Sequence, residues 1–192
     1  MSLLRNTVWM QRKRLKNGKG PFMALDLETT GLDPKTDRIV EAGWLSFNEE
    51  GINIENAFFS RIHQTQYSKS AIAIHEIRPF DTENGISEAE LLQQFMTNPP
   101  GTIWVGHNVQ FDLAMLKAVS KRLKRPWTKV RYVDTLAIAI AQARNPFYTQ
   151  NEDLDLSLSA LCKKAGILEE ANHNALSDAL ASALLFLSMR LK

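Results

Sequence analysis

Two acidic residues separated by one position stand in the first strongly apolar segment of the chain. Asp26 and Glu28 come directly after the apolar residues 22–25, with apolar Leu27 between them. This composition is typical of a buried strand. Alternate strand residues share a face, so we expect the two carboxylates on one side, roughly 6–7 Å apart. Buried carboxylates need a cation, and hard oxygen ligands favour Mg²⁺ or Mn²⁺. The same pair also occurs where a strand end reaches solvent, so it does not by itself establish a metal site.

A third acid, Asp178, lies in a segment that is apolar on nearly every side, residues 175–187. A lone carboxylate inside such a helix is costly without a charge partner. His173 stands five residues earlier, just ahead of the helix. It could present an imidazole close to whatever Asp178 binds.

A fourth acid, Asp112, follows residues 106–111, where a short strand gives way to a helix. It could point past the strand end, although an acid in a first helical turn also simply favours the helix dipole. Four carboxylates and one histidine are compatible with a hydrolytic site in which two ions, about 3.5–4 Å apart, hold the attacking and leaving oxygens of a phosphodiester. The histidine would take the proton of the attacking water.

The spacing His-x-x-x-x-Asp occurs twice, from His107 to Asp112 and from His173 to Asp178, so spacing alone does not select the base. His107 closes a short apolar strand and is predicted to be a hydrogen-bonded core histidine. His173 lies in a polar loop, residues 169–174, that can meet water. We therefore predict that His173 is the general base.

The elements that must carry these residues follow from periodicity and turn signals. Strands are predicted over 22–28, 38–47, 52–62, 102–106 and 131–133. Helices are predicted over 70–77, from Ser87 to the stop at 98–101, and over 111–123, 135–143, 156–165 and 175–189, with a surface loop over 145–155. Three hairpin strands followed by alternating helices and strands predict an α/β fold with a mixed five-stranded sheet flanked by helices.

Length and composition indicate one globular domain over residues 21–192, because 192 residues with 44% hydrophobic content can bury a sizeable core. The one cysteine, Cys162, cannot form an internal disulfide and is predicted to be a buried thiol in a helix. No apolar stretch is long enough to cross a membrane, and residues 1–20 lack the apolar core of a signal peptide. We therefore expect a cytoplasmic protein without membrane contact.

Positive charge is unevenly distributed along the sequence. Residues 1–20 contain six of the 23 Lys and Arg residues and no acid, so they form a basic N-terminal arm. A second basic cluster, from Lys117 to Arg131, contains seven Lys and Arg residues around Trp127 and no acid. Either cluster could hold phosphates, and Trp127 could stack on a base. Alternatively, the arm is a solvated leader, and the second cluster complements the C-terminal end of a helix dipole.

Taken together, the acidic motifs resemble the DnaQ-like 3′→5′ exonucleases of the DEDDh class, in the RNase H-like superfamily. This family includes polymerase proofreading subunits, RNase T and oligoribonuclease. The matching segments occur in family order at residues 24–32, 39–43, 106–112, 133–136 and 173–179. The tyrosine subclass has Tyr four residues before the last Asp, where this chain has Asn174, so the resemblance is to the histidine subclass.

The resemblance implies an RNase H-like fold and two Mg²⁺ or Mn²⁺ ions. It implies that the metal ligands are Asp26, Glu28, Asp112 and Asp178, with His173 as general base. It also places a group of residues beside the terminal nucleotide of a single-stranded DNA or RNA 3′ end: Thr29, Leu32, Asn108 and Phe111. A polymerase partner or a homodimer is compatible with the family, but no residue points to either.

One segment departs from the family pattern. Where the family often has His-Gly-Ile, this chain has His75, Glu76 and Ile77. His75 could therefore approach the substrate backbone, as in the family, or be a surface residue of a helix.

Two other functions remain open from the sequence. A non-catalytic nucleic-acid-binding module could retain the fold, although such a module would tolerate the loss of a ligand. A glycosidase could use a carboxylate pair, and its activity would survive a chelator. Release of nucleoside 5′-monophosphates that requires a divalent metal distinguishes a 3′→5′ exonuclease from both. The choice between DNA and RNA is not encoded in these motifs.

Overall fold

The computed structural model describes residues 21–143, 155–168 and 174–190. The predicted basic arm, almost all of the predicted 145–155 loop, and His173 therefore lie outside the described residues. Five strands form one sheet in the order β3-β2-β1-β4-β5. The strands are β1 (Phe22–Thr29), β2 (Ile39–Phe47), β3 (Ile52–Arg61), β4 (Ile103–Gly106) and β5 (Arg131–Asp134).

The sheet is mixed, as predicted. β1, β2 and β3 pair in antiparallel fashion, whereas β4 pairs parallel with β1 and with β5. β3 is an edge strand, and its pairing with β2 is interrupted: Asn53 pairs with Ser46 and Phe58 with Trp44, so four residues of β3 lie opposite one of β2.

Helices follow the order expected from the sequence. They are α2 (Lys69–His75), α3 (Glu88–Met96), α4 (Val109–Arg122), α5 (Thr135–Ala143), α6 (Leu158–Ala165) and α7 (Ala175–Arg190), with a short 3₁₀ helix, η1 (Pro79–Thr82). The predicted bounds are correct to within about two residues, but the 3₁₀ helix was not predicted. The capping box predicted for α3 is present, because Ser87 Oγ accepts from the Glu90 N–H at 3.2 Å and the Glu90 carboxylate accepts from the Ser87 N–H at 2.8 Å.

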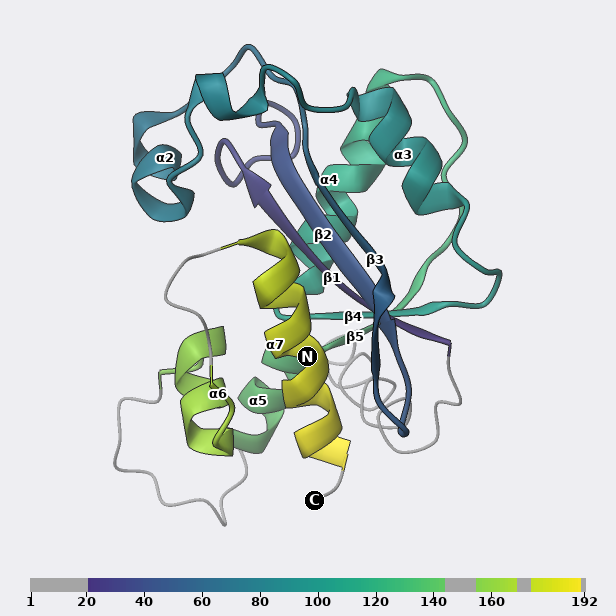
Figure 1. Cartoon of the computed structure of the whole chain (residues 1–192), viewed down its shortest axis with the longest axis vertical. Helices are drawn as coiled ribbons and strands as arrows, with labels where there is room; N and C mark the ends of the chain where they lie inside the picture. Colours follow the sequence, from purple (N-terminus) through teal and green to yellow (C-terminus); the bar gives the residue numbers. More distant parts are fainter. Residues whose placement is uncertain (1–20, 144–154, 169–173, 191–192) are drawn as a thin grey trace.

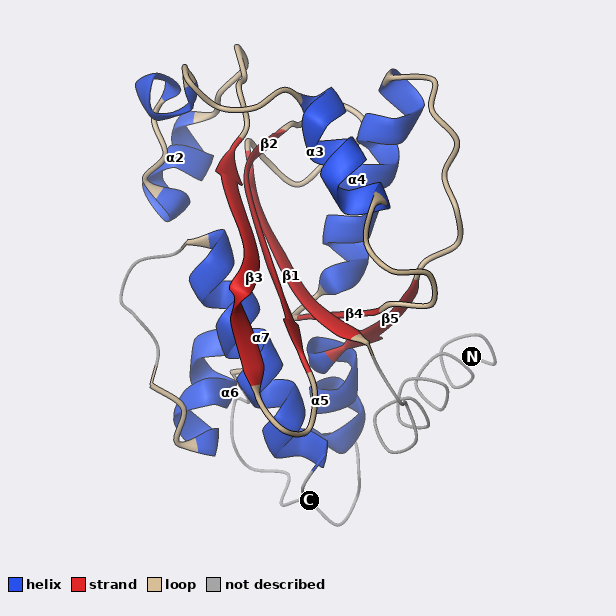
Figure 2. Ribbon diagram, turned by 45° about the vertical axis from the view of Figure 1, so that its right-hand side comes forward, coloured by secondary structure: helices blue, strands red, loops and turns tan. Residues whose placement is uncertain are grey.

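Helices cover both faces of the sheet (Figures 1 and 2). α7 crosses one face with α5 and α6 beside it, and α3 and α4 cover the other. Each face has its own apolar core, one containing Phe22, Ala24 and Phe186 and the other containing Leu25, Trp44 and Leu116. Because β1 alternates between these cores, Asp26 and Glu28 lie on the face covered by α7.

Gly43 allows α7 to approach that face closely. Gly43 on β2 pairs with Asp26 on β1. A β-carbon at Gly43 would lie 2.4 Å from the backbone nitrogen of Leu176, closer than any side chain tolerates. The first turn of α7 therefore rests directly on β2, beside Asp26.

The fold confirms one further expectation. Cys162 is fully buried in α6 and contacts α7, as predicted for a structural thiol. None of the helices within the described ranges combines the length and the apolar character needed to cross a membrane.

Candidate metal centre

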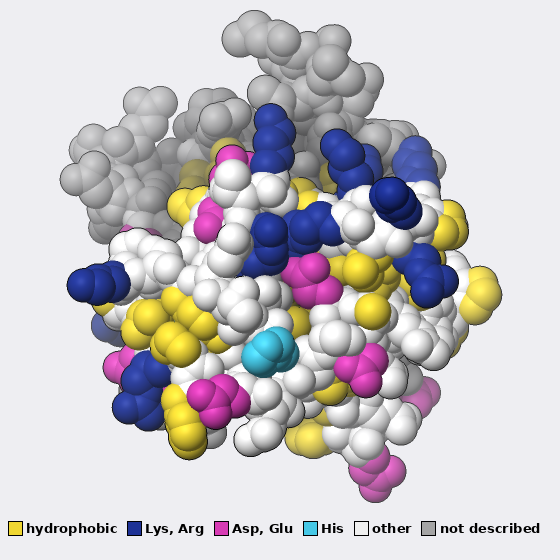
Figure 3. All heavy atoms as spheres, turned by 90° about the horizontal axis from the view of Figure 1, so that it is seen from above, with side chains coloured by type: hydrophobic (Ala, Val, Ile, Leu, Met, Phe, Trp, Pro, Cys, Tyr) yellow, Lys and Arg dark blue, Asp and Glu magenta, His cyan; other side chains and the backbone are white. Residues whose placement is uncertain are grey.

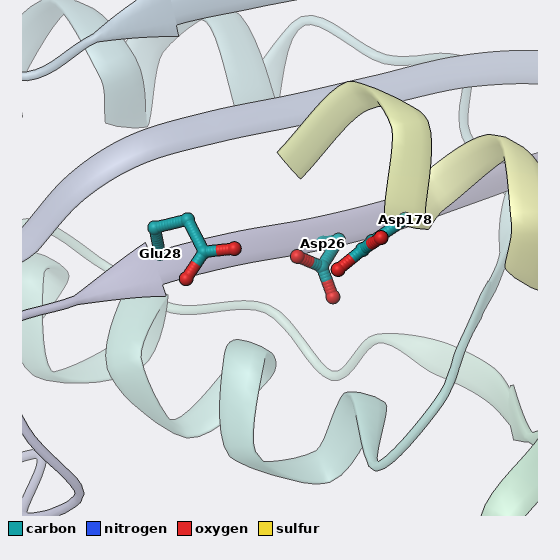
Figure 4. Close-up of side chains that lie close together, drawn as sticks. All are labelled: Asp26, Glu28 and Asp178. Carbon is teal, nitrogen blue, oxygen red and sulfur yellow. The ribbon is translucent and has the colours of Figure 1, made fainter. Parts of the chain in front are cut away.

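Three of the predicted carboxylates meet where α7 begins over β1. Asp26 and Glu28 project from β1 and Asp178 from the first turn of α7, and ligand oxygens of all three lie within 4.8 Å of one another. Figure 4 shows Asp26 and Asp178 side by side, with Glu28 further along the strand. The structure thus brings together residues separated by 150 positions, in an arrangement that a divalent cation fits.

Asp112 lies close to this cluster but is not one of the three. It stands in the first turn of α4 and is 4% exposed. Its charge is, after burial, the largest influence that raises the pKa of Asp26. Burial likewise raises the pKa of Asp112 well above its usual range, with further contributions from Asp134 and Glu28. The four acids therefore share one electrostatic environment.

This environment disfavours negative charge in the absence of a cation. Burial, followed by the charges of Asp178 and Glu41, raises the pKa of Glu28 to about 8, although Arg61 acts in the opposite direction. Burial and four neighbouring acids raise the pKa of Asp26 well above its usual range. Carboxylates in this condition are stabilised by a bound divalent ion, which compensates the desolvated charge.

A buried acid that was not assigned a role from the sequence stands next to the cluster. Glu41 on β2 pairs with Glu28 on β1 and is 0% exposed. Its carboxylate accepts a hydrogen bond from the Ala175 N–H at 2.8 Å and lies 2.9 Å from Arg61 Nε. The sequence signal that could have pointed to Glu41 is the presence of an acid within the largely apolar residues 39–47.

A second buried acid, Asp134 at the end of β5, organises the start of α4. Its Oδ1 accepts from the Asn108 N–H at 3.0 Å and from two N–H groups at the start of α5. His107, predicted to be a hydrogen-bonded core residue, is half-buried instead, and its Nδ1 lies 3.0 Å from Thr135 Oγ1. The hydrogen bond is therefore confirmed, whereas full burial is not.

The four residues predicted to contact substrate lie in different environments. Leu32 is 84% exposed in the loop after β1. Thr29 is buried, and its hydroxyl donates to the Gly31 carbonyl at 2.8 Å. Asn108 is exposed with a left-handed backbone, and Phe111 is half-buried against the core. Leu32 and Asn108 are thus free to meet a ligand, whereas the Thr29 side chain is engaged in the turn.

His75 is not a surface residue, so one of the two alternatives left open by the sequence is wrong. It is 6% exposed, and its Nδ1 accepts from the Ile77 N–H at 3.0 Å. Burial is the main cause that lowers its pKa. Glu76, which replaces the family glycine, has φ of 58°, a left-handed conformation that turns the chain inward after α2.

Some side chains between Lys117 and Arg131 contact other parts of the protein and are not available to a ligand in full. Arg122 pairs with Glu88 at 2.5 Å, and the ring of Trp127 stacks on Phe95 with centroids 5.7 Å apart. The other cations of this cluster are exposed: Lys117, Lys121, Lys124, Arg125, Lys129 and Arg131. Figure 3, which views the molecule from above, shows most of the visible Lys and Arg side chains in the upper part of that face, with others at its left edge.

Comparison with known proteins identifies the family. The model of the RNase T exonuclease family matches residues 23–186. The chain belongs to this exonuclease family. The resemblance inferred from the acidic motifs is therefore confirmed.

Two curated relatives are polymerase proteins. The exonuclease domain is 32% identical over 172 residues to the PolC-type DNA polymerase III of Thermotoga maritima, covering 88% of this chain and 12% of that protein. It is 32% identical over 171 residues to the DNA polymerase III subunit epsilon of Treponema pallidum, covering 88% of this chain and 75% of that subunit. The chain therefore spans only a small part of the PolC-type relatives.

A solved structure agrees on the fold. The zinc-ion-bound complex of Escherichia coli exonuclease I with single-stranded DNA superposes with a TM-score of 0.77 at 20% identity, covering 91% of this chain and 41% of that one. At this identity the superposition shows the fold, and it confirms the predicted RNase H-like arrangement of the exonuclease domain.

Proposed function

We propose that the protein is a metal-dependent 3′→5′ exonuclease that releases nucleoside 5′-monophosphates from single-stranded DNA or RNA ends. The observation that carries this proposal is the cluster of Asp26, Glu28 and Asp178, within 4.8 Å of one another, in a chain of the exonuclease family. Exonuclease I, which shares the fold, has been solved with single-stranded DNA and with a zinc ion.

The proposal includes a pair of Mg²⁺ or Mn²⁺ ions, and the carboxylates present are suitable ligands for such ions. Asp26, Glu28 and Asp178 offer carboxylate oxygens to one site, and the adjacent Asp112 extends the ligand set. Such ions supply an acidified water and stabilise the charge that develops on the leaving oxygen. The raised pKa values of Asp26 and Glu28 support this assignment, because a bound ion compensates both the burial and the repulsion that raise them.

The chain's own residues would position the strand end and move the proton. His173 takes a proton from water, whose oxygen attacks the phosphorus of the last phosphodiester. The bond from phosphorus to the 3′ oxygen of the preceding nucleotide breaks, and that oxygen takes a proton from solvent water to become the new 3′ hydroxyl. Exposed Leu32 and Asn108, together with Phe111, would hold the terminal nucleotide.

Degradation of a 5′-labelled single strand with Mg²⁺ or Mn²⁺ tests the proposal. We expect a ladder that shortens by one nucleotide per step and a product identified as nucleoside 5′-monophosphate. A strand whose 3′ end is blocked by an inverted linkage is the matched control and should stay intact. The strand with an unblocked 3′ end should also stay intact when EDTA removes the metal. Cuts within a circular single strand would contradict an exonuclease.

The same assay separates the remaining alternatives. Strand binding without nucleotide release at any metal concentration would indicate a binding module that retains the fold. Parallel DNA and RNA oligomers would show which sugar is preferred. The polymerase relatives make a polymerase partner a reasonable target for co-purification, and cytoplasmic localisation stays a prediction.

A further inference from the structure

Glu41 occupies a position that a carboxylate rarely takes. It is fully buried near the start of β2, on the face covered by α7, and pairs across the sheet with Glu28 on one side and Arg61 on the other. It is not part of the cluster formed by Asp26, Glu28 and Asp178. A charge in such a place is costly unless its contacts compensate for the lost hydration.

Those contacts lead to the beginning of α7. Glu41 Oε1 accepts from the Ala175 N–H at 2.8 Å, and Ala175 is the first residue of the helix. Glu41 Oε2 lies 2.9 Å from Arg61 Nε, which offsets the charge of the carboxylate. An N–H in a first helical turn has no partner within its own helix, so an anionic acceptor there binds strongly.

This bond fixes the part of α7 that carries Asp178. Asp178 lies in the first turn, and its N–H donates to the Asn174 carbonyl at 2.9 Å. The backbone of the same turn rests on Gly43. Contact with Gly43 limits how closely α7 approaches β2, and the bond to Glu41 limits how far it slides along the strand. Together they determine where Asp178 stands over Asp26.

We infer that Glu41, paired with Arg61, is a positioning residue that holds the start of α7 so that Asp178 can share a divalent ion with Asp26 and Glu28. The inference rests on the proposed function in that the carboxylate cluster is taken as a metal site. Glu41 itself would not ligate the ion.

Charge and position must be separated in the test, because removing Glu41 also removes a negative charge near the ion and leaves Arg61 unpaired. The variants R61Q/E41Q and R61Q/E41A serve this purpose, since they carry the same charge. The Gln side chain retains an oxygen that can accept from the Ala175 N–H, whereas Ala does not.

Direct Mn²⁺ binding, measured by calorimetry or by EPR of free Mn²⁺, is the main readout. We expect R61Q/E41A to bind Mn²⁺ at least about tenfold more weakly than R61Q/E41Q, since loss of groups that orient metal ligands typically costs roughly 10–100-fold in affinity. Raising the Mn²⁺ concentration should recover much of the lost nuclease rate, while KM for an oligonucleotide stays unchanged. Equal Mn²⁺ affinities in the two variants would overturn the inference.

Glu88→Gln is the matched control for loss of a partly buried ion pair. Glu88 pairs with Arg122 between α3 and α4, away from α7. This variant should lower the melting temperature without changing Mn²⁺ affinity. If R61Q/E41A behaves in the same way, its role is only structural and the inference fails.

The outcomes distinguish failure of the inference about Glu41 from failure of the proposed function. Mn²⁺ binding by the wild-type protein without nucleotide release would overturn the proposed function, while the comparison between R61Q/E41A and R61Q/E41Q would still decide the role of Glu41. Lack of Mn²⁺ binding by the wild-type protein would overturn both.

Discussion

At the scale of single residues, four acids at and beside the site fall into two groups. Glu41 and Asp134 accept hydrogen bonds from backbone N–H groups at helix starts. The Ala175 N–H and Arg61 partly compensate the charge of Glu41, although burial still raises its pKa. Burial and the charges of other acids raise the pKa of Asp26 and Glu28. The first group is suited to hold structure, and the second is suited to bind a cation.

Asp26→Asn is expected to abolish nuclease activity while raising the stability of the metal-free protein. The substitution removes a metal ligand and also removes a desolvated charge that Asp112 and Glu28 repel. In EDTA the melting temperature should rise, with each 1 kcal/mol giving about 2–4 °C for a domain of this size. Thermal unfolding in EDTA and an oligonucleotide assay in Mn²⁺ check the two effects.

Glu55→Gln, at an exposed acid on β3, is the control and should change neither quantity. Full activity of Asp26→Asn at ordinary Mg²⁺ would show that Asp26 is not a ligand.

Leu32→Ala is expected to weaken substrate binding without affecting the fold. The side chain is 84% exposed, so its removal should change the free energy of unfolding by no more than about 0.5 kcal/mol. If it packs against the terminal base, the loss of apolar contact should raise KM roughly tenfold, because burial of a leucine contributes about 1.5–3 kcal/mol. Steady-state kinetics on a short oligomer measures this change.

Leu168, which is 97% exposed after α6, offers a comparison. Leu168→Ala should leave KM unchanged, and a similar rise in KM for both variants would remove the specific role of Leu32.

At the scale of elements, the site depends on how two helices begin. α7 presents Asp178 in its first turn and α4 presents Asp112 in its first turn, so each helix needs a fixed start rather than a fixed end. Glu41 bonds to the first residue of α7, and Asp134 bonds to Asn108 just before α4. The same device, a buried acid from a neighbouring strand, therefore operates twice.

Gly43→Ala is expected to damage the site through the backbone. The new β-carbon would meet the Leu176 nitrogen at 2.4 Å, so α7 must move away from β2. Overpacking of this kind costs about 1–3 kcal/mol, and the shift would carry Asp178 away from Asp26. Urea unfolding and Mn²⁺ titration should show lower stability together with weaker Mn²⁺ binding. Wild-type values for both would mean that α7 adapts without moving Asp178.

At the scale of the whole molecule, the sheet brings acids from both halves of the sequence into one desolvated cluster. The stability of the metal-free protein should therefore depend on pH in a direction opposite to that of most proteins with paired carboxylates. The folded state raises the pKa of Glu28 from 4.5 to about 8. Between these values the folded state holds a proton that the unfolded chain has released.

Metal-free stability is consequently expected to fall as pH rises from about 5 to 8, by up to about 1.4 kcal/mol per pH unit for each proton. Urea unfolding in EDTA across this range measures the slope, which Glu28→Gln should reduce. With Mn²⁺ present the loss should be offset, because ion binding requires the deprotonated acids and strengthens as pH rises. A flat profile in EDTA would show that Glu28 titrates normally in the fold.

Much of this architecture could be predicted from the sequence, because periodicity and turn residues are local signals. The shared face of Asp26 and Glu28 follows from strand geometry, and the order of strands and helices follows from apolar patterns. Contacts between residues that are distant in the sequence could not be predicted in this way. Nothing local indicates that Glu41 bonds to Ala175, or that Gly43 is the point where α7 rests.

The wrong and incomplete predictions have similar causes. The sequence does not decide whether His75 is a surface residue or approaches the substrate, because helical periodicity does not indicate the left-handed turn at Glu76 that follows it. The sequence offers Trp127 as a stacking platform for a base, but it does not indicate that Phe95 stacks on its ring. In both cases a tertiary contact, rather than a propensity, determines where the side chain lies.

The separation of Glu28 and Asp178 along the chain has a consequence for biosynthesis. A ribosome adds about 5–20 residues per second, so roughly 8–30 s pass between the synthesis of these two residues. Until then the growing polypeptide has only the β1 pair of the cluster that Asp178 completes. A nuclease assembled in this order cannot form its full carboxylate cluster while residue 178 is still untranslated, so the proposed metal site is completed only after that residue has been synthesised.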